Sequence, residues 1–218
     1  MTVDPVFRNR GEQTLGNYNW IDLAEGSGYV TFYPVSTIEE TTENFTMLRT
    51  KRYGHTFEQT GIKTVGTITK EVDIDFDIKI NKPSIINGNV VVNMPFRFGH
   101  ENNNGTGDGY WIIKVRKYSG STETDLGSTQ SNAFNTVGGA GAYVWEYDVG
   151  AYMVDIDNAS LKRGDILRIT VEGWISSTNY GSTQIGFTYS PNDETTTWWT
   201  TENPTTTMTV DVPFKIDL

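Results

Sequence analysis

The stretch EVDIDFDIKI, residues 71–80, decides the fold class. Five apolar residues alternate in it with five charged ones. Successive side chains of a strand point to opposite faces, so this pattern predicts a β-strand with one buried face and one face in water. The wet face carries a row of four acidic residues: Glu71, Asp73, Asp75 and Asp77.

The same alternation returns along the rest of the chain. It recurs in residues 90–98, 111–116, 143–156, 167–172, 185–189 and 208–218. This spacing predicts about eight strands after residue 69, and no segment has the helical period of 3.6. The 31 threonines and 22 glycines fit strands and turns. We therefore expect an all-β protein, specifically an antiparallel jelly-roll β-sandwich formed by residues 63–218.

Residues 1–62 differ from this pattern and predict an N-terminal arm that serves as an attachment segment. Residues 1–19 hold few large apolar side chains, and residues 28–34 and 45–48 are short strand candidates. These short strands either add to the sandwich or dock on another molecule.

Local motifs give further expectations. Asn87-Gly88 favours a hairpin turn, and the Gly- and Asn-rich residues 101–109 predict irregular structure. Residues 119–141 predict a long loop with one short edge strand. Pro213 has no N–H to donate, so the last strand is expected at an edge or with that position turned outward.

Composition excludes several classes of protein. There are 17 Lys and Arg against 27 Asp and Glu, which gives a net charge of −10 and argues against a nucleic-acid partner. The absence of cysteine excludes disulfides and thiol chemistry. No apolar run approaches the ~18 residues of a membrane span, and the first residues do not read as a signal peptide. We expect a soluble protein made in a cytosol, with no membrane partner.

The sequence gives weak support for catalysis. His55 and His100 both lie beside glycines and are expected at the surface, and no Gly-x-Ser-x-Gly motif is present. The acidic row could supply the paired carboxylates of a glycoside hydrolase. The favoured interpretation is a solvated face that Lys114, Arg116 or Arg97 neutralises from neighbouring strands. We therefore expect no catalytic residues.

No cofactor or metal is expected either. Oxygen ligands for calcium occur in two places, but Asx-rich loops more often satisfy their own turns. Those candidates are Glu101, Asn103, Asn104 and Asp108, or Asp155 with Asp157. The tripeptide Arg163-Gly164-Asp165 is the one that integrins recognise, but here it predicts a tight turn before a strand.

Trp198 and Trp199 are the candidate surface contact. Adjacent residues of a strand point to opposite faces, so the two rings cannot both enter one core. At least one is then available for sugar stacking or a protein contact. The alternative places one ring in the core and the other over the edge of the sandwich.

Four segments carry a resemblance to a known group. Residues 17–33, residues 72–83 and the closing residues 212–218 resemble largely uncharacterised structural proteins of tailed viruses of prokaryotes. Residues 161–169, with the Gly164-Asp165 turn, are similar to the strand entry of tumour-necrosis-factor-like jelly rolls.

This resemblance implies a non-enzymatic virion protein, made in the host cytoplasm, that serves as a capsid decoration or head-fibre component. Its implied partners are the major capsid protein and further copies of itself, often three. Two other classes remain open. One is a carbohydrate-binding or receptor-binding β-sandwich module that uses Trp198 and Trp199, and the other is a β-sandwich glycosidase or lyase that uses the acidic row.

Overall fold

The computed structural model describes residues 27–39, 42–52, 54, 57–101, 105–137, 143–194 and 205–215. Several predictions concern residues outside these ranges: His55, Asn103, Asn104, Trp198, Trp199, and residues 1–26 and 216–218.

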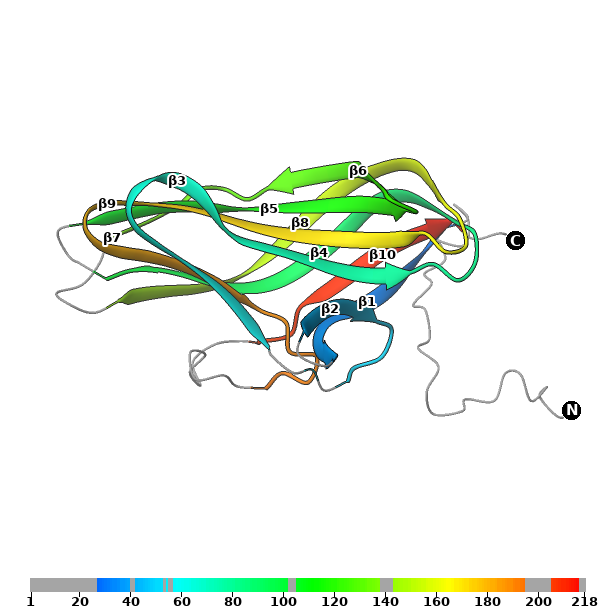
Figure 1. The fold of residues 1–218 in the computed structure, drawn as a ribbon, viewed down its shortest axis with the longest axis horizontal. Helices are drawn as coiled ribbons and strands as arrows, with labels where there is room; N and C mark the ends of the chain where they lie inside the picture. The colour runs from blue at the N-terminus through cyan, green and yellow to red at the C-terminus, as the bar shows by residue number, and fades with distance from the viewer. Residues whose placement is uncertain are drawn as a thin grey trace, which may run out of the picture.

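The described residues form ten strands and no helix, so the all-β prediction is confirmed (Figure 1). The strands are β1 Ser27–Glu39, β2 Thr42–Leu48, β3 Glu58–Lys79, β4 Ser84–His100, β5 Thr106–Ser119, β6 Thr122–Gln130, β7 Phe134–Val137, β8 Val144–Leu161, β9 Ile166–Thr188 and β10 Thr209–Lys215.

All ten strands belong to one sheet, in which only β2 and β3 pair in parallel, through Thr46 and Asp77. The main path of the sheet runs β6-β5-β9-β3-β2-β1-β10-β4-β8. The first part of β9 pairs with β3 and β5, whereas its last residues pair with β3 and β4. Because β9 joins both portions, the sheet folds over on itself and encloses a core (Figure 1).

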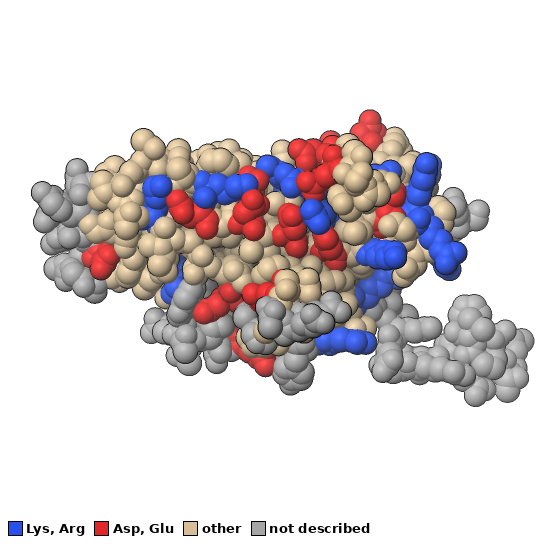
Figure 2. All heavy atoms as spheres, viewed as in Figure 1, with Lys and Arg blue, Asp and Glu red and all other residues tan. Residues whose placement is uncertain are grey.

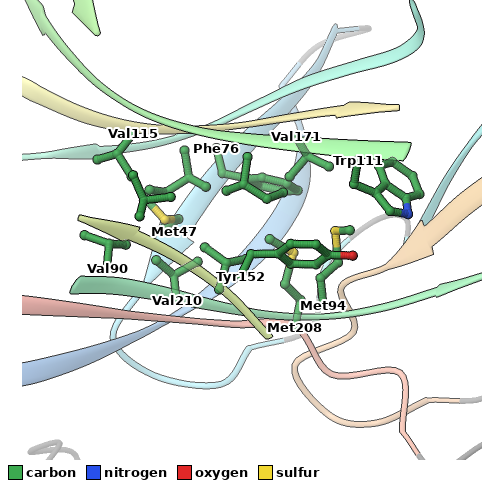
Figure 3. Close-up of a cluster of buried hydrophobic side chains, with 14 of the residues drawn as sticks. Met47, Phe76, Val90, Met94, Trp111, Val115, Tyr152, Val171, Met208 and Val210 are labelled. Carbon is green, nitrogen blue, oxygen red and sulfur yellow. The ribbon is translucent and has the colours of Figure 1, made fainter. Parts of the chain in front are cut away.

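The core lies between these two facing portions of the sheet. Figure 3 shows Phe76, Trp111 and Val171 on one side and Val90 and Val210 on the other, all pointing into the same space. Each of these five side chains is fully buried. The even-numbered residues of β3 from Val72 to Ile78 turn toward this space, as the alternation in residues 71–80 predicts.

Several local expectations were wrong. Gly88 is no hairpin turn but a positive-φ residue (φ 111°) where the pairing of β4 with β8 shifts register. β5 already begins at Thr106, inside the stretch expected to be irregular. The expected loop 119–141 contains two strands, β6 and β7, because polar Thr- and Ser-rich residues suit the sheet edge that they occupy.

The last described strand is also not at an edge. β10 pairs with both β1 and β4, and Pro213 lies opposite Tyr29 of β1. The register against β4 shifts between Asp211 and Phe214. That irregularity accommodates a residue that cannot donate a ladder hydrogen bond.

Residues 27–39 and 42–48 of the expected N-terminal arm add strands to this sheet. β1 pairs with β10 from Ser27↔Lys215 to Phe32↔Val210, and with β2 further along. The expected division at residue 62 falls inside β3, which runs continuously from Glu58 to Lys79.

Candidate functional site

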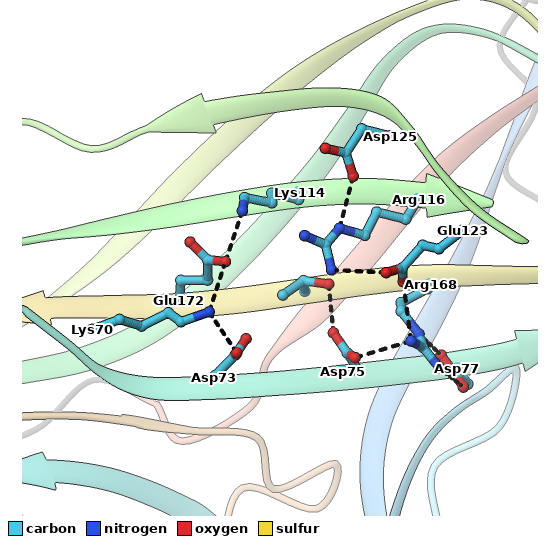
Figure 4. Close-up of polar contacts among 11 residues, drawn as sticks. Lys70, Asp73, Asp75, Asp77, Lys114, Arg116, Glu123, Asp125, Arg168 and Glu172 are labelled. Atoms are coloured by element: carbon cyan, nitrogen blue, oxygen red, sulfur yellow. Dashed lines mark hydrogen bonds and ion pairs between the residues drawn. The ribbon is translucent and has the colours of Figure 1, made fainter. Parts of the chain in front are cut away.

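The acidic row forms part of an ion-pair network that spans four strands, β3, β9, β5 and β6 (Figure 4). The register of β3 against β9 places Asp73, Asp75 and Asp77 opposite Glu172, Thr170 and Arg168. Arg168 binds both carboxylate oxygens of Asp77, at 2.7 Å from Nε and 2.8 Å from Nη2. Its Nη1 lies 3.1 Å from Asp75 Oδ2, and Thr170 also donates to Asp75.

Two arginines face each other across the next strand pair, Arg116 of β5 and Arg168 of β9. Like charges in that position repel, but Glu123 of β6 bridges them. Its carboxylate lies 3.4 Å from Arg116 Nη1 and 3.0 Å from Arg168 Nη1. Asp125 binds Arg116 Nε at 2.9 Å. The ionic contacts around Arg168 raise its pKa above the ordinary value, chiefly through the hydrogen bonds with Asp77.

Glu172 is the buried member of this network, with a side chain that is 3% exposed. It accepts from Lys114 Nζ at 2.7 Å, from Trp174 Nε1 at 3.1 Å and from Lys70 Nζ at 3.4 Å. Burial works to raise its pKa, but these partners outweigh burial and hold the pKa below the ordinary value. A general acid needs the opposite shift, so the shift at Glu172 is the reverse of what that role requires, and the ion pairs of Glu172 connect β9 with β3 and β5.

The favoured interpretation of the acidic row therefore agrees with the geometry, although the cations that bind the row differ from the three expected ones, and Arg116 pairs instead with Glu123 and Asp125 of β6. Arg168 and Lys70 neutralise it directly, and Lys63 lies 3.3 Å from Glu71. Lys114 belongs to the same network through its ion pair with Glu172. Arg97 lies elsewhere: its guanidinium is buried 4.0 Å from the centre of the Trp145 ring, and burial lowers its pKa.

The expectation of surface histidines was wrong for His100. Its side chain is fully buried at the end of β4, with Nε2 3.2 Å from Ser177 Oγ. Ser177 is itself 1% exposed, so this pair is closed to a substrate. The alternation could have indicated this position, because residue 100 continues the inward-facing series of residues 90–98.

Among the described residues no group of three or more metal-ligating side chains comes together. Of the calcium candidates, Glu101 accepts from Ser182, and Asp108 accepts from Asn135. Asp155 and Asp157 are exposed on β8. No helix in the described ranges is long and apolar enough to cross a membrane.

A cluster that sequence reasoning missed lies at one end of the molecule. We call it the basic end: Arg49, Lys79 and Lys82 line one cavity there, Lys162 and Lys215 line a second that shares Ser84 with the first, and Arg163 lies in the turn that is hydrogen-bonded to Ile80. Figure 2 shows Lys and Arg gathered at the right-hand end, whereas acidic side chains are numerous along the middle of the same face. Residues far apart in the sequence meet here because β3, β8 and β10 all finish at this end (Figure 1).

Two tight turns at the basic end are hydrogen-bonded to each other. Ile80 N donates to the Asp165 carbonyl at 2.8 Å, and Gly164 N donates to the Ile80 carbonyl at 2.8 Å. Asp165 Oδ2 accepts from the Lys162 amide at 2.8 Å and lies 3.2 Å from Lys117 Nζ. The Lys162 amide is the main cause that lowers the pKa of Asp165.

The predicted turn at Arg163-Gly164-Asp165 is therefore confirmed, with Gly164 at φ 97°. The Asp165 carboxylate that an integrin would need is 5% exposed and engaged within the turn.

A cavity of about 520 Å³ opens at the basic end. Its apolar wall includes Val30, Phe32 and Phe214, and its cations are Arg49, Lys79 and Lys82. A second cavity, about 330 Å³, includes Lys162 and Lys215 and shares Ser84 with the first. The pair combines apolar surface with positive charge, which suits an anionic ligand that carries an apolar group.

Another hollow, of about 370 Å³, lies beside β8. Phe96, Phe134 and Tyr152 contribute aromatic surface, and Gln130 and Asn132 contribute amide groups. Burial raises the pKa of Tyr152. Half-buried aromatic pairs occur elsewhere: Tyr110 stacks on Trp174 at 6.2 Å between ring centres, and Tyr143 stacks on Trp145 at 4.7 Å.

Comparisons with known proteins do not identify a family for the chain. No family model matches the chain, and no curated protein matches it. Similar solved structures include a CocE/NonD family hydrolase from Staphylococcus aureus, 10% identical, with a TM-score of 0.45 over 86% of this chain and 37% of the hydrolase. An aminopeptidase from a marine sediment Thaumarchaeota archaeon is 10% identical, with a TM-score of 0.49 over 88% of this chain and 37% of the aminopeptidase.

The chain thus spans 37% of the length of each of these two structures. At this identity and these TM-scores, the likeness carries no argument about activity.

Proposed function

We propose that the chain is a non-enzymatic structural protein of a virus particle, a capsid decoration or head-fibre component that attaches to a capsid lattice. The observation that carries the non-enzymatic part is the ion-pair network. Its carboxylates are bound by cations from neighbouring strands, and the one resolved carboxyl pKa shift within it is downward, at Glu172. Cross-linking four strands in this way suits a rigid structural body. The virion assignment is supported by the sequence resemblance.

The proposal includes the jelly-roll β-sandwich. Two features support it: the two facing portions of the sheet with a core between them (Figure 3), and the pairing of β1, the first described strand, with β10, the last. Within this proposal, residues 1–62 remain the attachment segment, although β1 and β2 belong to the sheet.

The proposed partners are the major capsid protein and further copies of the chain, as a homo-oligomer such as a trimer, with no nucleic acid or membrane. Exposed apolar side chains support self-association. On β3, Ile62 and Val65 are 53% and 56% exposed, and on β8, Met153 is 61% exposed. Light scattering behind size exclusion tests this part, with Ile62→Glu and Met153→Glu as separate variants. A wild-type monomer at all concentrations would contradict it.

Quantitative mass spectrometry of particles purified from the virus that encodes the chain tests the main proposal. A decoration or fibre protein is expected at many copies per particle, in a fixed ratio to the major capsid protein. Absence of the chain from particles, while it accumulates in the infected cell, would contradict the proposal.

The alternative is a carbohydrate-binding or receptor-binding module, and the hollow beside β8 favours it. An aromatic wall beside amide groups is the composition with which proteins bind sugars. A glycan array tests it, with the variants Phe134→Ala, Trp198→Ala and Trp199→Ala. Specific glycan binding that any of these variants abolishes would favour the module, whereas no binding by the wild-type protein would contradict it.

A further inference from the structure

Two groups of cations in the described chain differ in their partners, while Lys117, beside the turn at Asp165, pairs with that residue at 3.2 Å. Lys70, Lys114, Arg116 and Arg168 each lie within 4.0 Å of a carboxylate on the network face. At the basic end, Lys79, Lys82, Lys162, Arg163 and Lys215 make no ion pair with any described residue. Surface that evolves only for solubility has little reason to keep like charges together without counter-charges, because they repel one another.

The cavity at this end adds shape to the charge. Its volume of about 520 Å³ falls within the range of ligand sites in proteins. Phe32 and Phe214 pack edge to face at 6.4 Å and form part of the apolar wall. Arg49 lies 5.8 Å from the centre of the Phe32 ring. A ligand that entered here would meet aromatic surface inside and positive charge around it.

The surface is also held in place before any ligand arrives. Lys82 lies in the turn after β3, and Lys162 lies in the turn after β8. Both turns are tied together by the two 2.8 Å backbone hydrogen bonds at Ile80 and Gly164. Fixed charges lose less entropy on binding than charges on mobile loops.

We propose that this cavity binds an acidic peptide segment of a partner protein, with a large apolar side chain of that peptide in the cavity and its flanking carboxylates on Lys79, Lys82 and Arg49. Charge complementarity selects the acidic flanks, and the apolar wall selects the side chain between them. The cavity includes Val30, Phe32 and Arg49 from the segment to which the virion proposal assigns attachment. Peptide binding is nevertheless measured on the purified chain, so its outcome does not depend on whether the chain is found in particles.

Fluorescence anisotropy tests the site with a labelled pentapeptide that has one phenylalanine between two pairs of acidic residues. We expect saturable binding to the full chain that weakens as salt rises from 50 to 300 mM, because the contacts at the rim are ionic. Replacing the phenylalanine of the peptide by alanine should weaken binding about tenfold. No saturation with the chain at millimolar concentration would overturn the proposal.

Three variants locate the binding. Lys82→Glu should weaken binding about tenfold, and so should Ser84→Trp, which fills the cavity without changing its charge. Arg163→Glu is the matched control, because it makes the same change of charge at the basic end on a residue that does not line either cavity. It should stay within about twofold of wild type.

Circular dichroism establishes that each variant folds. If Ser84→Trp does not fold, Lys79→Glu replaces it, because Lys79 is exposed. An equal loss in Arg163→Glu and Lys82→Glu would overturn the proposal in favour of diffuse attraction. Tighter binding of a 20-nucleotide single-stranded DNA, or of phosphatidylserine vesicles, at the same salt would overturn the choice of a peptide.

Discussion

Replacing Glu172 by glutamine tests whether the ion-pair network stabilises the fold. The substitution keeps the shape of the side chain and its acceptor for Trp174 Nε1, but it removes the charge that binds Lys114 at 2.7 Å and Lys70 at 3.4 Å. Breaking a fully buried ion pair costs about 3–5 kcal/mol, because the remaining charge is stranded. Here the two lysines are 22% and 34% exposed and can turn toward water.

We therefore expect Glu172→Gln to lower the free energy of unfolding by about 2 kcal/mol at pH 7. For a domain of this size, that corresponds to a fall of about 4–8 °C in melting temperature. Urea unfolding followed by tryptophan fluorescence, together with a thermal melt, measures both quantities. Asp125→Asn is the control, because Asp125 pairs with Arg116 at 2.9 Å while 66% exposed. It should change stability by less than about 1 kcal/mol.

Acidification gives the same experiment a second readout. The folded pKa of Glu172 lies below its ordinary value, and an unfolded glutamate titrates near ~4.3. The stabilisation by this group is thus fully present above about pH 5 and is lost as the pH falls through the folded pKa. The difference between wild type and Glu172→Gln should shrink as the pH is lowered from 6 toward 3. A difference that is independent of pH, or a loss no larger than that of Asp125→Asn, would refute the reasoning.

Three further substitutions test other parts of the fold. Gly109→Ala should lower the free energy of unfolding by about 1–3 kcal/mol, because the new Cβ would lie 2.8 Å from Ile175 Cγ2. Gly120→Asn is the control and should be tolerated, because Gly120 has φ 64° and open space around it. Equal melting temperatures for the two variants would contradict the predicted clash at Gly109. Phe76→Ala should lower the free energy of unfolding, measured in urea, by about 3–5 kcal/mol. The fully buried Phe76 ring packs edge to face on three other rings. A loss below about 1 kcal/mol would contradict that packing. Asp165→Asn should lower the melting temperature at pH 7, because its carboxylate accepts from the Lys162 amide and pairs with Lys117. The difference should fade below about pH 4, because the folded pKa of Asp165 is lowered. An unchanged melt at pH 7 would contradict the role of this carboxylate in closing its own turn.

The sequence was most informative where one face of a strand is apolar and the other charged. Residues 71–80 predicted their part of β3 and the outward acidic row, because alternation alone fixes which face is buried. The same rule, carried through to residue 100, would have placed His100 inside. Gly99, directly before it, instead favoured a turn at the surface, but Gly99 lies within β4 and packs tightly against Trp145.

Strand length and pairing were not predictable in the same way. β9 runs for 23 residues through Gly173, Gly181 and Gly186, which read locally as strand ends. Gly173 is instead required by packing, because a Cβ there would lie 2.8 Å from the Trp111 ring. Such contacts come from strands distant in the sequence, so no local pattern contains them. The partner of Asp77 likewise depended on register, which placed Arg168 opposite it.

Net charge does not describe how charge is distributed over an elongated molecule. The net charge of −10 argues against anionic ligands only if a ligand interacts electrostatically with all charges of the chain. The Debye length at physiological salt is about 8 Å. Asp73 lies six residues before Lys79 along β3, a separation of about 20 Å in a strand, and Asp77, which is nearer, is held by Arg168 at 2.7 Å. A ligand at the basic end is therefore screened from most of the acidic row but close to several cations. Its attraction depends on where the turns place Lys82 and Lys162, not on the total charge. The exclusion of nucleic acid drawn from composition remains a prediction, and the DNA competition at the basic end tests it directly.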